Sequence, residues 1–216
     1  MDFSTIDTAL VAKLLLLLLI GMGPKIALVP FLEKTKHFDA ETQRAVGRRM
    51  VVTAVVTALV LFAFGALLMR LLHITGGAVA VAGGIILALL AIEMVMGHGE
   101  KAVEEQLVVK DDPAKIAVYP LAVPYLLNPV GITILIIASD EVVSLASVGL
   151  VLGLVFLVGA FDYWIFANID KLSKRLNPTG LVISEVVFGI LLTAVAVQLT
   201  VTGLGSLGII APSTAH

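Results

Sequence analysis

The sequence predicts an all-α integral membrane protein with six transmembrane helices, built as a 3+3 inverted-topology repeat with broken helices in spans 1 and 4. Three observations predict this fold. Hydrophobic residues make up 59% of the chain and charged residues 14%, with a mean hydropathy of +1.09, whereas soluble domains carry about 25% charged residues. The apolar residues gather in long runs, which is typical of membrane spans. Pro24 and Pro129 lie 105 residues apart, each in the middle of such a run.

Six apolar segments are each long enough to cross a hydrocarbon layer of about 30 Å with some tilt. We expect helices at about 8–32, 47–70, 75–97, 115–139, 142–168 and 178–204. Before the second span, Asp39 is expected to cap a helix N-terminus, with Glu41 in its first turn. Asp2 and Asp7 stand where a signal peptide has basic residues, so the first span is expected to stay in the mature protein.

The spacing of the two prolines recurs elsewhere in the chain, which indicates an internal duplication. At the same offset Gly84 aligns with Gly189, and Ala91 aligns with Ala196. A hydrophilic stretch separates the two halves. We therefore divide the chain into a first three-helix repeat at 1–97, a cytoplasmic linker at 98–114 and a second three-helix repeat at 115–216. The two repeats together form one membrane domain.

Basic residues predict how the chain lies in the membrane. Eleven of the fourteen Lys and Arg residues lie in the loops after spans 1, 3 and 5, and Arg70 alone lies on the opposite side. The positive-inside rule places the basic loops in the cytoplasm and both termini outside. Three spans per repeat is an odd number, so the second repeat enters the membrane from the opposite face. Inverted repeats of this kind give transporters alternating access to one site.

The two prolines are expected to break their helices near the membrane centre, because proline removes a backbone donor and forces the preceding residue out of the α-helical region. Irregular backbone at that depth is tolerated where it is buried or lines a wet cavity, and a half-helix N-terminus suits a carboxylate. The predicted substrate-binding residues surround the breaks: Gly23, Pro24, Lys25, Ile26, Asn128, Pro129, Val130, Gly131 and Thr133. Pro120 and Pro124 are interpreted as residues that shape span 4. The alternative is that all these prolines only kink helices for packing.

Three ionisable residues within the spans are candidates for gating or coupling. Lys25 directly follows the first break, and Asp162 and Glu185 lie at a similar depth in spans 5 and 6. A charged side chain inside a bilayer is costly unless it is paired or hydrated, so one hypothesis is that Lys25 pairs with one of the acids, Glu185 preferred, as a cytoplasmic-side gate or a proton-linked switch. In the alternative interpretation, Lys25 snorkels to the inner interface and both acids face the cytoplasmic vestibule.

Motifs for enzyme chemistry are absent from the sequence. It has no cysteine, no His-Glu-x-x-His pair, no nucleophile elbow and no phosphate-binding glycine loop. We therefore expect no enzymatic activity, no metal site and no cofactor. No nucleic-acid partner is expected either.

Several stretches of the chain resemble the MarC family, also called the neutral amino acid transporter family. They are Ile116–Pro124, Ala82–Leu87 and Gly189–Leu199, and the resemblance covers nearly all six predicted helices. The family usually shows Asn-Pro at the first break and Gly-Pro-Gly at the second, whereas these breaks read Gly23-Pro24-Lys25 and Asn128-Pro129-Val130-Gly131. The resemblance implies an inner-membrane protein of a bacterium or archaeon. Some relatives move alanine or glycine, with coupling to H⁺ or Na⁺ in some of them.

The leading prediction is a secondary-active transporter of small neutral amino acids, working by alternating access around Pro24 and Pro129. Its expected partners are the amino acid, the lipid bilayer and H⁺ or Na⁺, and neither import nor export is favoured. The alternative is a passive channel or a non-transporting membrane protein in which the breaks are structural. Because aromatic residues are few, at 6% of the chain, the sequence gives no support for a drug-sized cavity.

Overall fold

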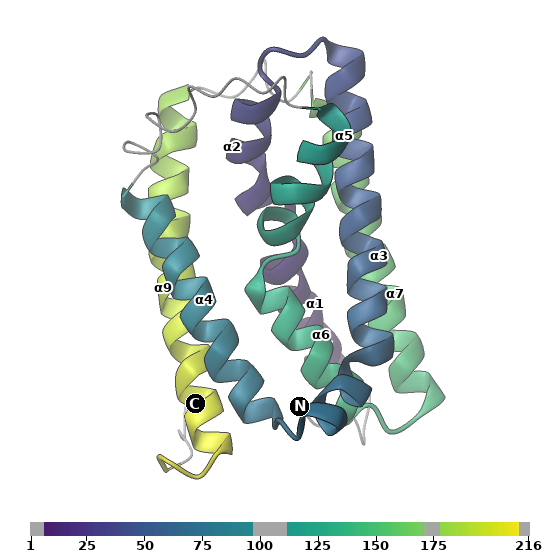
Figure 1. Cartoon of the computed structure of the whole chain (residues 1–216), viewed down its shortest axis with the longest axis vertical. Helices are drawn as coiled ribbons and strands as arrows, with labels where there is room; N and C mark the ends of the chain where they lie inside the picture. The colour runs from purple at the N-terminus through teal and green to yellow at the C-terminus, as the bar shows by residue number, and fades with distance from the viewer. Residues whose placement is uncertain (1–6, 97–111, 170, 172–177, 212–216) are drawn as a thin grey trace.

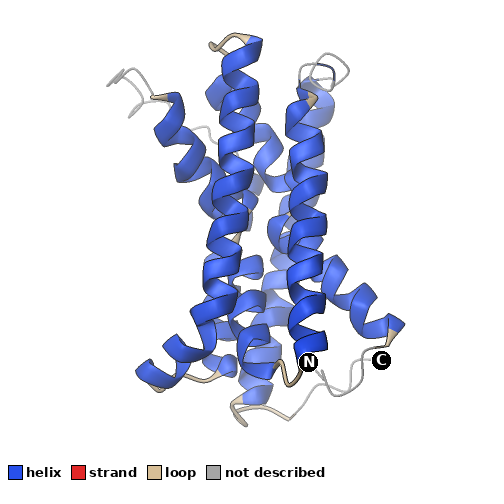
Figure 2. Ribbon diagram, turned by 90° about the vertical axis from the view of Figure 1, so that its right-hand side faces the viewer, coloured by secondary structure: helices blue, strands red, loops and turns tan. Residues whose placement is uncertain are grey.

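A computed structural model of the chain describes residues 7–96, 112–169, 171 and 178–211. Over these residues the chain forms helices joined by loops, without a strand (Figure 2). Five helices are long and apolar enough to cross a membrane, and a sixth span results if two helices that meet at a 72° bend are taken as one. The all-α membrane class is therefore confirmed. Apart from 112–114, the predicted linker lies outside the described residues.

The helices agree with the predicted spans. Span 1 consists of two helices, and span 4 consists of two helices and an irregular helical stretch between them. Their bounds, in chain order, are α1 (Thr8–Met22), α2 (Pro24–Thr35), α3 (Ala40–Leu72), α4 (Gly76–Met96), α5 (Pro113–Ile116), the irregular η2 (Ala117–Leu126), α6 (Pro129–Glu141), α7 (Leu145–Ala167) and α9 (Pro178–Ser206).

Helix α3 begins at Ala40, before the start of the predicted second span at 47. Asp39 occupies its N-cap position and Glu41 lies in its first turn, as predicted. The residues before 47 are mostly polar, because hydropathy marks where a helix can meet lipid and not where the helix itself begins. The first turns of α3 are therefore expected to project beyond the hydrocarbon layer.

The helices are arranged in three layers (Figure 1). On one side α4 packs along α9, and on the other α3 packs against α7. Between these pairs lie the two broken helices, α1–α2 and η2–α6, which also contact each other. Both breaks therefore lie in the middle layer, flanked by unbroken helices.

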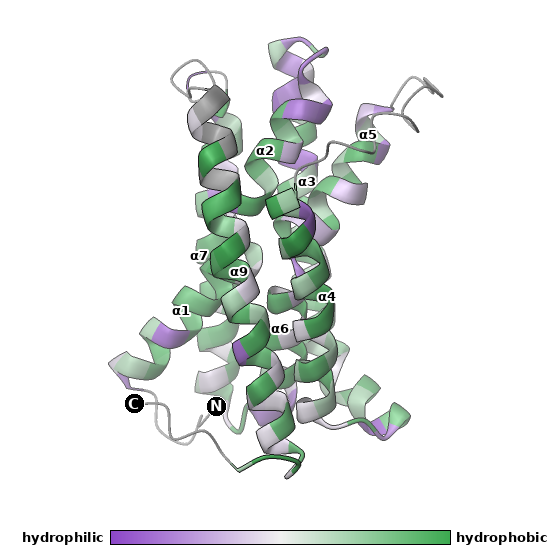
Figure 3. Cartoon of the chain, turned by 90° about the vertical axis from the view of Figure 1, so that its left-hand side faces the viewer, coloured by the Kyte–Doolittle hydropathy of each residue, from purple (hydrophilic) through white to green (hydrophobic). Residues whose placement is uncertain are grey.

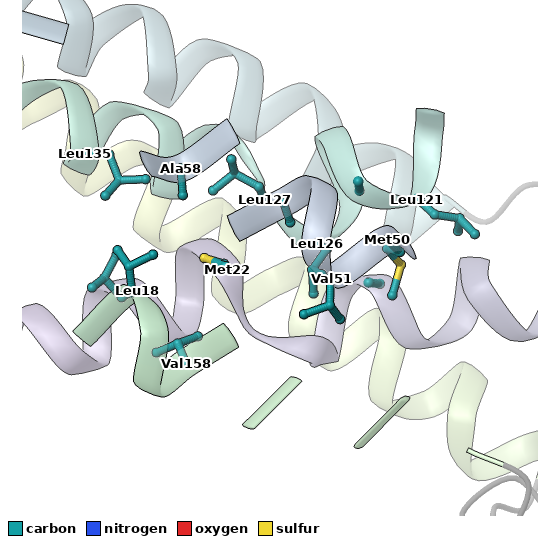
Figure 4. Close-up of a cluster of buried hydrophobic side chains, with 14 of the residues drawn as sticks. Leu18, Met22, Met50, Val51, Ala58, Leu121, Leu126, Leu127, Leu135 and Val158 are labelled. Atoms are coloured by element: carbon teal, nitrogen blue, oxygen red, sulfur yellow. The ribbon is translucent and has the colours of Figure 1, made fainter. Parts of the chain in front are cut away.

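Buried apolar side chains fill the space between the middle layer and the α3–α7 pair. This core includes Leu18 and Met22 of α1, Val51 of α3, Val158 of α7, and Leu127 between η2 and α6 (Figure 4). On the outside of the bundle, large apolar side chains such as Leu67, Leu89 and Ile190 are more than half exposed, at 60%, 64% and 58%. Such a surface suits contact with lipid and not with water.

Two glycines allow α4 and α9 to approach closely. A Cβ on Gly84 would lie 2.8 Å from the carbonyl oxygen of Ala196, and a Cβ on Gly189 would lie 3.0 Å from that of Ala91. Because these residues pair at the 105-residue offset, each contact is the repeat-related counterpart of the other. The 105-residue offset thus relates the two close contacts at which α4 and α9 cross. An inverted symmetry of the whole chain stays a prediction.

The described chain begins and ends at the same end of the bundle (Figure 1). The loop before α3 and the start of α5 lie at the opposite end, where hydrophilic residues gather on both helices (Figure 3). The loop that follows span 1 and the start of α5 are therefore on one side of the bundle. The assignment of this side to the cytoplasm stays a prediction.

Candidate functional site

The first break lies at Gly23, between α1 and α2. Gly23 has an extended backbone with φ −83° and ψ 162°, and Pro24 starts the next helix. An extended residue before proline is expected, because the proline ring crowds the helical conformation of its neighbour. Since Pro24 has no N–H, the carbonyl oxygen of Ile20, four residues earlier, loses its helical donor. Pro30, in contrast, does not interrupt its helix and lies within α2.

The second break lies around Asn128 and is more extensive. Tyr119, Val123 and Asn128 each precede a proline, and each has an extended backbone, with φ of −136°, −135° and −88°. The helical path is therefore interrupted three times, and α6 leaves at 72° to the preceding segment. Pro120 and Pro124 thus shape span 4 as predicted, because the residue before each of them leaves the helical conformation.

Asn128 joins the two breaks. Its side-chain Nδ2 donates a hydrogen bond of 2.6 Å to the carbonyl oxygen of Ile20, and its backbone N–H donates one of 2.9 Å to that of Gly21. These two oxygens would accept from residues 24 and 25 if α1 continued as a regular helix. Asn128 thus replaces the donors that the first break removes, and it does so from the second half of the chain.

The two half-helix N-termini are capped differently. The Oδ1 atom of Asn128 accepts hydrogen bonds from the backbone N–H groups of Val130 and Gly131, at 2.9 Å and 3.3 Å, and so caps α6. At α2 the cap residue is Gly23, and no side chain caps the helix. The N–H groups in the first turn of a helix have no acceptor within it, so α2 offers a site for an anion.

The broken helices cross at two glycines. A Cβ on Gly21 would overlap the backbone of Gly131, and a Cβ on Gly131 would overlap that of Gly21. Gly131 was among the predicted site residues, but Gly21 and Ile20 were not. Ile20 could have been found from sequence, since it lies four residues before Pro24. Gly21 could not, because its partner lies in a distant part of the chain.

A cavity of about 1060 Å³ lies beside the first break, between α1–α2, α7 and α9. Its lining includes four predicted residues of the first break, namely Gly23, Pro24, Lys25 and Ile26. Apart from Lys25 and Gln198, the lining side chains are apolar. The volume lies at the upper end of the range for ligand sites. The low aromatic content did not indicate such a space, because helix placement and not aromatic content creates it.

The predicted residues of the second break do not line this cavity. Asn128, Pro129, Val130, Gly131 and Thr133 are all buried. Thr133 packs against Gly83 of α4, where a Cβ would overlap the threonine side chain. The structure thus brings the two breaks together through Asn128, and this cavity borders the first of them alone.

The two sides of the middle layer differ at positions that the repeat relates. Gly83 and Thr133 correspond, at the 105-residue offset, to Phe188 and Leu28. Whereas Gly83 and Thr133 touch, Phe188 and Leu28 both line the cavity. The bundle is therefore closed between α4 and α6 and open between α9 and α2.

The predicted ion pair of Lys25 with Asp162 is not formed. Lys25 is exposed, and its Nζ atom lies 4.4 Å from the ring centroid of Phe188, in a cation–π contact. Asp162 is fully buried in α7 and is not among the cavity-lining residues, although its neighbour Phe161 is. The side chain of Glu185, the preferred partner, lies outside what the structure describes, so that pairing stays a prediction.

Comparison with known proteins places the chain in a family. Residues 8–207 match the model described as MarC family integral membrane protein. A UPF0056 membrane protein of Methanocaldococcus jannaschii is 27% identical over 85% of this chain and 90% of the relative. Proteins with the same description from Pyrococcus horikoshii and Aquifex aeolicus are 28% and 29% identical, over 91% and 92% of this chain and 98% and 94% of the relatives. No solved structure matches the chain. Because the family match extends from α1 to the end of α9 and includes both breaks, the chain belongs to the MarC family of integral membrane proteins.

Proposed function

We propose that this protein is a secondary-active transporter of small neutral amino acids, working by alternating access around the two joined helix breaks. The observation that carries the proposal is the environment of Asn128. Its amide satisfies the backbone of both breaks, while the uncapped N-terminus of α2 lines a cavity. Discontinuous helices with free half-helix ends are the usual substrate sites of secondary transporters.

The substrate carboxylate would bind at the N-terminus of α2. The first-turn N–H groups and the Lys25 ammonium group both attract an anion, and Lys25 is the charged residue among the cavity-lining residues. The apolar remainder of the lining suits an uncharged side chain. These features favour a neutral amino acid, the substrate class that the family resemblance implies. The cavity volume leaves room for neutral amino acids larger than alanine.

The difference between the two sides of the middle layer supports a two-state cycle. In one state α4 closes on α6 and α9 stands away from α2, as in this structure. Exchange of these two arrangements would close the present cavity and open one beside the second break. We place the protein in the cytoplasmic membrane with both termini outside, because the positive-inside rule requires this of the basic loops.

Flux in proteoliposomes tests the proposal. Purified protein is reconstituted into liposomes loaded with unlabelled alanine, and uptake of labelled alanine is measured across a panel of competing amino acids. Saturable counterflow, which neutral amino acids inhibit and charged ones do not, is the expected result. Linear, non-saturable uptake would identify a channel, and uptake no faster than in protein-free liposomes would indicate a non-transporting protein.

A further inference from the structure

Asp162 of α7 is the one charged residue among the fully buried residues that the structure describes. Its exposed fraction is 0%, and neither carboxylate oxygen has a hydrogen-bond partner among the described residues. Buried polar groups are normally hydrogen-bonded, and buried carboxylates are normally paired or bind a cation. A packing role explains neither the choice of an acid at this position nor its lack of a partner.

The contacts of α7 place Asp162 beside the first break. One turn before it, a Cβ on Gly159 would lie 2.5 Å from the side chain of Val55 in α3 and 3.9 Å from that of Met22 at the end of α1. One turn after it, Phe166 packs on Phe31 of α2, with ring centroids 5.0 Å apart. Residues three and four apart share one face of a helix. Asp162 therefore faces the junction of α1, α2 and α3, at the level of the break.

Charged groups on the neighbouring helices do not neutralise Asp162. On α2, the ammonium group of Lys25 lies over Phe188 in the cavity, and on α3, Arg48 and Arg49 are exposed. On α1, Lys13 is exposed and lies more than two turns before the break. Tyr163, next to Asp162 on α7, is exposed as well. None of these groups is therefore a partner of the buried carboxylate.

We infer that Asp162 is the binding site of a monovalent cation, H⁺ or Na⁺, at the junction of α7 with the first helix break. A proton or Na⁺ would neutralise a carboxylate that has no other partner, and half-helix C-termini and unwound carbonyl groups are the usual Na⁺ ligands in broken-helix transporters. The last turn of α1 ends at this level. Asn128 engages the carbonyl oxygens of Ile20 and Gly21, which leaves that of Met22 as the candidate ligand.

Release of the cation would change the shape of the cavity and so act on the transport cycle. This part of the inference rests on the proposed function. Without the cation, the carboxylate requires hydrogen-bond donors, and the uncapped first turn of α2 carries the donors of the break. To engage them, α2 and α7 must shift relative to each other. Because both helices line the cavity, cation occupancy and cavity shape would change together.

Thermal unfolding tests the site without requiring transport, because a cation that binds only the folded state stabilises it more as the cation concentration rises. Purified wild type, Asp162→Asn and the control Asp140→Asn, which alters an exposed acid, are melted over a range of Na⁺ concentrations at fixed ionic strength, and over a range of pH. A melting temperature that rises with Na⁺ more in the wild type than in Asp162→Asn identifies Na⁺, and a difference between these two proteins that depends only on pH identifies H⁺. We expect Asp162→Asn to lose this dependence and Asp140→Asn to keep it.

Two results would overturn the inference: no dependence on either ion in the wild type, or equal dependence in Asp162→Asn. If Asp162→Asn does not fold, Asp162→Glu should still shift the midpoint cation concentration several-fold, and an unchanged midpoint counts against the site. Counterflow assays separate this inference from the proposed function. A melting temperature that responds to the cation, without counterflow, contradicts the transport proposal but supports the cation site. Counterflow without such a response supports transport and contradicts the cation site.

Discussion

The side chain of Asn128 donates a hydrogen bond of 2.6 Å to the carbonyl oxygen of Ile20, the oxygen that Pro24 leaves without a helical donor. This bond connects residues 108 positions apart and joins the two halves of the chain at their breaks. The same side chain caps α6 through its oxygen. Asn128 therefore holds both broken helices in one geometry.

Replacement of Asn128 should damage both breaks. Asn128→Ala removes the cap of α6 and leaves the Ile20 oxygen unsatisfied, at a combined cost of about 2–4 kcal/mol in the free energy of unfolding. Asn128→Asp keeps an acceptor for the cap but has no donor for Ile20. We expect both variants to melt at lower temperature, as followed by circular dichroism in detergent, and to lose counterflow.

Asn168→Ala is the matched control for the Asn128 variants. Asn168 also donates from its side chain to a backbone carbonyl oxygen, that of Trp164, but at the exposed end of α7. Its loss should leave the melting temperature and counterflow nearly unchanged. If Asn128→Asp behaved like Asn168→Ala, the hydrogen bond to Ile20 would have no role in joining the breaks.

The crossing of Gly21 with Gly131 should tolerate no added side chain. A Cβ at either position would overlap the backbone of the other, so Gly21→Ala should cost about 1–3 kcal/mol or more through forced separation of the helices. Gly149→Ala and Gly153→Ala are the controls, because a Cβ at either of these α7 positions has nothing within 4 Å. The melting temperature of Gly21→Ala should therefore be lower than those of the two controls. Equal melting temperatures for Gly21→Ala and Gly153→Ala would refute this prediction.

How far the sequence predicts this molecule depends on the distance over which each cause acts. Pro24 and Pro129 break their helices through local sterics, so both breaks were predictable. The N-cap position of Asp39 before α3 was predictable as well, because it follows from a local residue preference. The bond from Asn128 to Ile20 joins distant positions, and no local rule selects that pairing. Among the predicted site residues, only those of the first break line the cavity, since this depends on how α9 is placed.

Lys25 should contribute to substrate affinity. Lys25→Met keeps an unbranched side chain of similar length but removes the charge that would face the substrate carboxylate. A charge-assisted hydrogen bond contributes about 1.5–3 kcal/mol, so the KM for alanine exchange should rise about tenfold or more while the maximal rate changes less. Lys13→Met, on the exposed face of α1, is the control. An unchanged KM in Lys25→Met would exclude Lys25 from the binding site.

Orientation in the membrane is open to a direct chemical test, because the chain has no cysteine and single-cysteine variants carry one label each. Val143 lies 73% exposed in the loop after α6, and His37 is exposed in the loop before α3. With the basic loops in the cytoplasm, a membrane-impermeant maleimide added to intact cells should label Val143→Cys and leave His37→Cys unlabelled until the cells are opened. The reverse pattern would invert the topology.

The repeat-related pairs of the middle layer provide a test of alternating access. Leu28 and Thr133 stand at related positions, yet Leu28 lines the cavity and Thr133 is buried against Gly83. In the state described here, Leu28→Cys should react quickly with a small thiol reagent, and Thr133→Cys should react slowly. Substrate and a gradient that favour the opposite state should slow the first reaction and speed the second, because closing α9 on α2 accompanies the separation of α4 from α6. If the two rates instead rose and fell together, the breaks would open as a single pore, and the protein would be a channel and not a carrier.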